Sequence, residues 1–160
     1  MLLALVREPH VRRFLFDDRL VDRGWIDEAC GASVQRFADG SLGLFVARFL
    51  DEPHPVVGFT GFLPVYDPPV LELVYALAPS FVGHGLATEM ARAMIGLAFG
   101  RHGLDVVRAS TDEPNRASIR VLERLGMSSA GCTPGPRWPQ LHFELARARW
   151  SERGGDLPRE

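Results

Sequence analysis

The chain has 160 residues, a formal net charge of −2 and 46% hydrophobic residues. This length fits one domain with its own core, and the near-neutral charge argues against a nucleic-acid partner. The two cysteines, Cys30 and Cys132, are too few for a disulfide framework or a zinc site, and the five histidines lack ligand spacing, so we expect no metal.

No membrane-associated segment is evident. The opening run Met1–Val6 is too short for the apolar region of a signal peptide, and Arg7 and Glu8 interrupt it. No stretch of the chain is long enough to span a bilayer. We therefore expect a cytoplasmic protein with no membrane partner.

Hydrophobic patterning and turn residues predict alternating helices and strands. In chain order we expect a helical region interrupted by a proline, a second helix, three strands, a long helix, a strand, a short helix and two strands: 2–20 with Pro9, Trp25–Phe37, Leu44–Leu50, Val56–Leu63, Leu71–Leu77, 86–102, Val106–Thr111, Asn115–Leu125, Ser128–Thr133 and Leu141–Ala146. Residues 51–55 are expected to connect two of these strands as a hairpin. This order predicts an α/β (α+β) fold with a mixed sheet over residues 1–150 and a polar tail over 151–160.

A strand, a glycine-rich turn and a helix follow one another between Leu71 and Phe99. The turn is Val82-Gly83-His84-Gly85-Leu86-Ala87. Glycines permit a tight turn and a close approach of a ligand to the backbone. The first turn of a helix offers free N–H groups and a positive dipole end, which suits a phosphate. The turn lacks the third glycine of a Rossmann motif and the lysine of a P-loop, and its glycines could also serve geometry alone.

This turn resembles the acetyl-CoA signature Arg/Gln-x-x-Gly-x-Gly/Ala of the GNAT N-acetyltransferase superfamily. Gly85 and Ala87 match the signature, whereas Val82 replaces the usual Arg or Gln. The longer string Pro79–Glu89 resembles the RimJ/RimL-like branch, in which an apolar residue commonly takes that place. The resemblance implies a mostly antiparallel central sheet flanked by helices. Family members usually begin with a strand, but this chain begins in a helical pattern, which leaves one sheet edge undetermined.

A second stretch, Ala109–Met127, also resembles the RimJ/RimL-like branch. It places Asn-x-x-Ser after a strand and before an amphipathic helix that ends on Leu-Gly-Met. Asn115 can donate to and accept from the amides of pantetheine, or it can simply cap the helix. The resemblance implies that residues at the end of the central strand, in the turn and at Asn115 bind acetyl-CoA: Ala76, Leu77, Val82, Gly83, His84, Gly85, Leu86, Ala87, Thr88 and Asn115.

The side chains of His84, Arg120 and Arg124 could serve the cofactor or only face solvent. His84 is better explained as a solvated side chain than as a base. Arg120 and Arg124 fit a solvated helix face, although either could reach a 3′-phosphate.

Acetyl transfer to an amine needs a deprotonated amine and a proton for the departing thiolate. Glu72 occupies the strand position at which some family members carry a carboxylate base, and burial would raise its pKa into a useful range; a solvent-facing or Arg-paired Glu is the alternative. The tyrosine that many members place seven residues after the Asn is Leu122 here. Ser118 is therefore the candidate donor to sulfur, with Tyr75 and Cys132 as less favoured candidates.

The sequence thus predicts an N-acetyltransferase that uses acetyl-CoA and joins it to an amine acceptor, either a protein N-terminus or a small molecule, by direct attack in a ternary complex. Two alternatives remain open: a catalytically silent acyl-CoA-binding module on the same fold, and a nucleotide-binding module. The acceptor is not identified by any motif. Apolar surface left by a missing first strand leaves a homodimer open.

Overall fold

The computed structural model describes residues 1–50 and 56–152, and its centre is one six-stranded sheet of order β1-β2-β3-β4-β6-β5. The strands are β1 (Leu44–Arg48), β2 (Val56–Val65), β3 (Val70–Leu77), β4 (Val106–Asp112), β5 (Ser128–Thr133) and β6 (Gln140–Ala146). The helices are α1 (Leu2–Arg7), α2 (Pro9–Leu15), α3 (Arg23–Ala38), α4 (Leu86–Gly100), α5 (Arg116–Leu125) and α6 (Arg147–Glu152), with a 3-10 turn, η1, at Pro79–Phe81.

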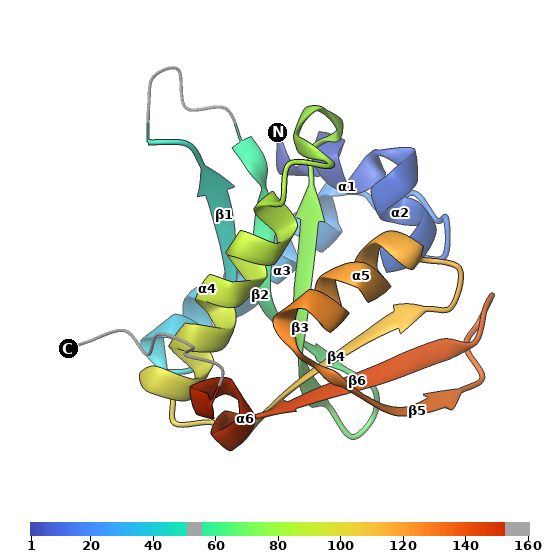
Figure 1. Ribbon diagram of the computed structural model, residues 1–160. Helices are drawn as coiled ribbons and strands as arrows, with labels where there is room; N and C mark the ends of the chain where they lie inside the picture. The colour runs from blue at the N-terminus through green and yellow to red at the C-terminus, as the bar shows by residue number, and fades with distance from the viewer. Residues whose placement is uncertain (51–55, 153–160) are drawn as a thin grey trace.

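The sheet is mixed, because β3 and β4 are parallel whereas every other neighbouring pair is antiparallel. β2 and β3 pair along their whole shared length, from Gly58↔Leu77 to Val65↔Val70. By contrast, β3 and β4 meet at a single pair, Glu72↔Arg108. Beyond that pair the two strands diverge toward their carboxyl ends and leave a wedge in the sheet (Figure 1).

Helices cover both faces of the sheet (Figure 1). On one face, α4, α5 and α6 bury a core around Phe62, Leu73, Ile95 and Trp150. On the other face, α1, α2 and α3 bury a smaller core around Val6 and Phe59. Alternate residues of β3 belong to the two cores: Leu71, Leu73 and Tyr75 to the first, and Val74 and Ala76 to the second. Because side chains alternate along a strand, Glu72 lies on the α1–α3 face.

The predicted mixed fold and its order of elements are confirmed. Pro9 divides the first helical region, since it is the first residue of α2. α4 ends at Gly100, two residues before the expected end at 102. Just beyond it, Gly103 adopts a φ of 63°, and the Leu104 N–H donates to the Ala98 carbonyl at 3.0 Å, which gives a carbonyl at the end of the helix a partner. The first element is indeed a helix, and β1 forms an edge of the sheet.

The sequence did not predict two features of the structure. β2 continues through Pro64 to Val65, two residues beyond the expected end. α6 is short and polar and crosses the expected boundary at residue 150; it is held by Trp150, which is only 2% exposed. The expected hairpin connection at 51–55 and most of the expected tail lie outside the described residues. Within the described ranges, no helix has both the length and the apolarity that a membrane crossing requires.

Candidate active site

The glycine turn leads directly into α4 at the open end of the wedge. Gly83 and Gly85 adopt φ values of 89° and 80°, and Gly85 is the N-cap of the helix. A Cβ atom added to either glycine would meet nothing within 4 Å. These glycines are therefore needed for their left-handed backbone and not for packing.

The amino end of α4 has the properties of an anion site. The first N–H groups of a helix have no intrahelical acceptor and lie at the positive end of the dipole. In the first turn, the Thr88 Oγ1 atom is buried and has no hydrogen-bond partner among the described residues. Val82 (50% exposed) and His84 are exposed beside the turn. An orphaned hydroxyl next to free N–H groups fits a phosphate group.

The end of β3 presents the backbone of Leu77, and not that of Ala76, to the wedge. The Ala78 N–H donates to the Val57 carbonyl at 2.8 Å, so the polar groups of Ala78 point toward β2. Because these directions alternate in an antiparallel pair, those of Ala76 also point toward β2 and those of Leu77 point away from it. The Leu77 carbonyl is 2.9 Å from the ring Nε2 of His10 on α2.

α5 lies across the wedge from β3, and the two elements contact each other through a tyrosine. The Asn115 Oδ1 atom caps α5 by accepting from the Ser118 N–H at 3.2 Å. The Ser118 Oγ atom is 2.8 Å from the hydroxyl oxygen of Tyr75 on β3. Burial raises the pKa of Tyr75 to about 12, against the opposing effect of its hydrogen bond to Ser118. The phenol therefore stays protonated at neutral pH and can donate to Ser118.

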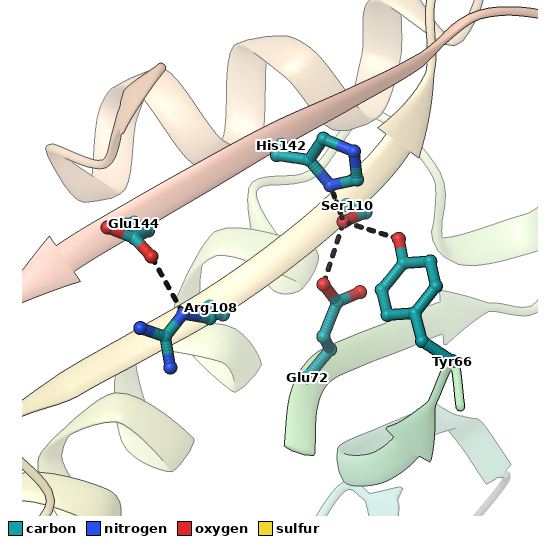
Figure 2. Close-up of polar contacts among 6 residues, drawn as sticks. All are labelled: Tyr66, Glu72, Arg108, Ser110, His142 and Glu144. Carbon is teal, nitrogen blue, oxygen red and sulfur yellow. Dashed lines mark hydrogen bonds and ion pairs between the residues drawn. The ribbon is translucent and has the colours of Figure 1, made fainter. Parts of the chain in front are cut away.

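Glu72 lies at the closed end of the wedge and is 6% exposed. Figure 2 shows its carboxylate directed at Ser110 of β4, whose hydroxyl donates to Glu72 Oε1 at 2.8 Å. The Ser110 Oγ atom is also 2.8 Å from His142 Nδ1 on β6 and accepts from the Tyr66 hydroxyl at 3.1 Å. The neighbouring Arg108 pairs with Glu144 at 2.7 Å (Figure 2).

Burial is the main influence on the charge of Glu72. It raises the pKa of this carboxyl above the ordinary value of 4.5, against the lowering effects of the Ser110 hydrogen bond and of His142 and Arg108. Burial likewise raises the pKa of Asp112 at the end of β4, where Asp17 raises it further and Arg137 lowers it. A carboxyl whose pKa is raised accepts a proton more readily than an ordinary one, which suits a general base.

The structure lays the candidate residues out along the two edges of the wedge. Leu77, the glycine turn and Asn115 surround its open end, and Glu72 lies at its closed end. Arg120, Arg124 and Cys132 are exposed, and Leu122, which takes the place of the usual tyrosine, is buried in the core at 1% exposure.

Sequence reasoning missed Ser110, which hydrogen-bonds to Glu72, and it missed His142 and Tyr66, which hydrogen-bond to Ser110. Ser110 and His142 face each other in the β4–β6 register but are 32 positions apart in the sequence. Only a predicted strand register could have brought them together. Tyr66 lies in the turn before β3 with a φ of 72°.

Comparisons with known proteins identify one family. The family model described as "Acetyltransferase (GNAT) domain" matches residues 1–128. The uncharacterized protein YkkB of Bacillus subtilis is 36% identical over 131 residues, which cover 77% of this chain and 71% of YkkB.

Two solved structures have the same fold. A putative GNAT-family acetyltransferase from Bordetella pertussis superposes with a TM-score of 0.73 at 21% identity, over 90% of this chain and 88% of that chain. The putative acetyltransferase yncA from Salmonella typhimurium, solved with its cofactor acetyl-CoA, superposes with a TM-score of 0.70 at 20% identity, over 99% of this chain and 87% of that chain.

Proposed function

Because this chain belongs to the GNAT acetyltransferase family, we propose that it transfers the acetyl group of acetyl-CoA to a primary amine. The observation that carries this proposal is the wedge between β3 and β4, which are joined only at Glu72↔Arg108. A buried carboxylate lies at its closed end, and a helix N-terminus with free N–H groups lies at its open end. An amine and a thioester could meet between these two groups.

The residues at the open end fit the parts of acetyl-CoA. Gly83, Gly85 and Thr88 would hold the pyrophosphate through N–H groups and the free Thr88 hydroxyl. The Leu77 backbone would pair with a pantetheine amide like an added strand, and the Asn115 side-chain amide would donate to another. When bound, acetyl-CoA supplies the activated acetyl group.

Direct attack in a ternary complex needs no nucleophilic residue from the protein. Glu72 would take the proton of the amine, directly or through water. Ser118 would donate a hydrogen bond to the departing sulfur. The Tyr75 hydroxyl, 2.8 Å from Ser118 Oγ, would donate to Ser118 and leave the serine proton free for that role.

The acceptor we propose is a protein N-terminal α-amine or a small-molecule amine, in keeping with the RimJ/RimL-like branch. Support comes from the strings Pro79–Glu89 and Ala109–Met127 of the sequence. A second candidate function is a catalytically silent acyl-CoA-binding module. The core position of Leu122, where many members carry a tyrosine, favours that alternative.

A thiol-release assay tests the proposal. The purified chain is incubated with acetyl-CoA and a panel of free-amino peptides and small amines, and each peptide is matched by its N-acetylated form as the control. Amine-dependent thiol release supports the enzyme. Calorimetric binding of coenzyme A without release on any amine would support the silent module, and ATP or NAD binding that pantetheine does not compete with would support a nucleotide site.

A further inference from the structure

We propose that Glu72 and His142 act as one base that shares a single proton through the Ser110 hydroxyl. The inference rests on the proposed function and extends it from Glu72 on β3 to Ser110 on β4 and His142 on β6. It follows from the chain of contacts in Figure 2: Glu72 Oε1 to Ser110 Oγ, 2.8 Å, and Ser110 Oγ to His142 Nδ1, 2.8 Å. The chain continues from His142 Nε2 to Thr133 Oγ1, also 2.8 Å.

The number of protons in this chain constrains how the bonds are directed. Ser110 has one proton and three polar partners: Glu72, His142 and Tyr66. An ionised carboxylate can only accept, so the serine proton goes to Glu72. His142 must then donate through Nδ1, and in a neutral ring Nε2 accepts from Thr133. With Glu72 ionised, both Glu72 and His142 are hydrogen-bonded to Ser110 in this arrangement, and the single Tyr66 proton is shared between Ser110 Oγ at 3.1 Å and Gln140 Oε1 at 2.9 Å.

A proton taken up by Glu72 allows the opposite arrangement. For this arrangement His142 must exchange its protons with solvent, losing the one on Nδ1 and gaining one on Nε2 beside Thr133. The Glu72 O–H then donates to Ser110 Oγ, and the serine donates to the bare His142 Nδ1. Transfer of the carboxyl proton to Ser110, together with transfer of the serine proton to Nδ1, yields a carboxylate and an imidazolium. Two O–H bonds break, one O–H and one N–H bond form, and no other reactant is needed.

The surroundings allow the proton to leave at the far end of the chain. Thr133 is exposed on the edge strand β5, so the Nε2–H of the imidazolium can pass to solvent there. Glu72 itself is 6% exposed and exchanges poorly with bulk water. The pair thus gives a buried base an outlet that lies away from the open end of the wedge, where the cofactor would bind.

Other charged groups face the pair and are kept in the test proteins. Arg108 and Glu144 form an ion pair beside Glu72 on β4 and β6. Tyr66 faces the pair from the turn before β3, with its ring centroid 6.0 Å from that of His142. Asp112 acts on Tyr66 from the end of β4. None of these groups is altered in the variants below, so a change in pH dependence reports the pair.

The test uses three variants. Ser110→Ala removes the bridge, and Ser110→Thr restores a hydroxyl at the same place. His142→Asn keeps a donor near the Nδ1 position but cannot hold the proton. We expect kcat to fall by roughly 10- to 100-fold in Ser110→Ala and His142→Asn, because each variant removes part of the rate gain that a general base supplies. The KM for acetyl-CoA should not change. The loss should shrink as pH rises, and Ser110→Thr should recover most of kcat.

A second measurement needs no acceptor. Nitrogen-15 spectra of the wild type above neutral pH should show His142 as the Nδ1–H tautomer, its signal being assigned by its loss in His142→Asn. Ser110→Ala should lose that tautomer, and Ser110→Thr should keep it. The same His142 tautomer in wild type and Ser110→Ala would overturn the inference, and so would superimposed pH–rate profiles for an active wild type and His142→Asn. If no amine is acetylated, the proposed function fails, and the tautomer result alone decides whether the pair exists.

Discussion

Asn115 offers a test in which stability and binding are predicted to separate. Its Oδ1 atom caps α5 through the Ser118 N–H at 3.2 Å. A side-chain amide also carries two N–H donors on Nδ2, and neither is needed for the cap. We therefore expect the oxygen to stabilise the helix and the nitrogen to donate to a pantetheine carbonyl.

Three substitutions separate these roles. Asn115→Asp keeps the capping oxygen and removes the N–H donor, and Asn115→Ser keeps a capping oxygen without adding charge but replaces the amide by a shorter side chain whose hydroxyl does not extend to the place of the amide nitrogen. Asn115→Ala removes both. Loss of an N-cap costs about 1 kcal/mol, which corresponds to a Tm decrease of roughly 2–4 °C in a chain of this size. Loss of one hydrogen bond of about 0.5–1.5 kcal/mol weakens binding by roughly 2- to 12-fold.

Calorimetric titration of coenzyme A and thermal unfolding measure the two effects on the same proteins. We expect the Asp and Ser variants to keep the wild-type Tm but bind more weakly, and the Ala variant to lose both. If the Asp and Ser variants bind as tightly as the wild type, Asn115 serves the helix alone. If the Asp and Ser variants lose Tm as the Ala variant does, the observed cap is not what stabilises α5.

Five other expectations follow from the structure. Glu72→Gln should lower turnover by roughly 10- to 1,000-fold with a loss that shrinks at high pH, as a pH–rate profile would show. Burial raises the pKa of Glu72 in the folded state, so ionisation of this carboxyl destabilises the fold once the pH rises above its ordinary pKa of 4.5. Glu72→Gln should therefore be more stable than the wild type at neutral pH but not in acid, and urea unfolding at these two pH values tests this. Gly85→Val should weaken coenzyme A binding, whereas Gly131→Val, a matched strain control on β5 with a φ of 122°, should not. Trp150→Ala should destabilise by about 3–5 kcal/mol in chemical denaturation, with Trp150→Phe milder. Ser118→Ala should lower kcat more than Tyr75→Phe, and the double variant should be no slower than Ser118→Ala.

Local signals in the sequence were enough to predict the elements that we propose to bind acetyl-CoA. The apolar period from Leu86 to Phe99 predicted α4, and paired glycines predicted the turn before it. The residue type of Asn115 and its place before a helical pattern allowed for the cap of α5 that the structure shows. Each of these features is set by neighbours in the chain.

The parts that sequence reasoning did not find depend on distant segments. The wedge depends on where β3 and β4 stop pairing, which no local pattern records. The contact between His10 and Leu77 joins positions 67 apart. α6 contains too few apolar residues to show a periodic pattern in the sequence. Two distant contacts hold it: Trp150 packs against the ring of Phe99, and the Arg147 side chain donates to the Leu104 carbonyl. Tertiary packing decides such features.

The expected order of the Ser118 and Tyr75 effects follows from which group can release a proton. The pKa of Tyr75 is raised to about 12 because the phenol is buried, so this hydroxyl donates hydrogen bonds but does not give up its proton readily. Its contact with Ser118 Oγ at 2.8 Å can orient the serine hydroxyl and polarise it. Ser118 would then make the contact with sulfur, and Tyr75 would act only through Ser118. Removal of the serine therefore abolishes both contributions, which is why the double variant should add nothing. A double variant much slower than Ser118→Ala would show instead that Tyr75 reaches the leaving group independently.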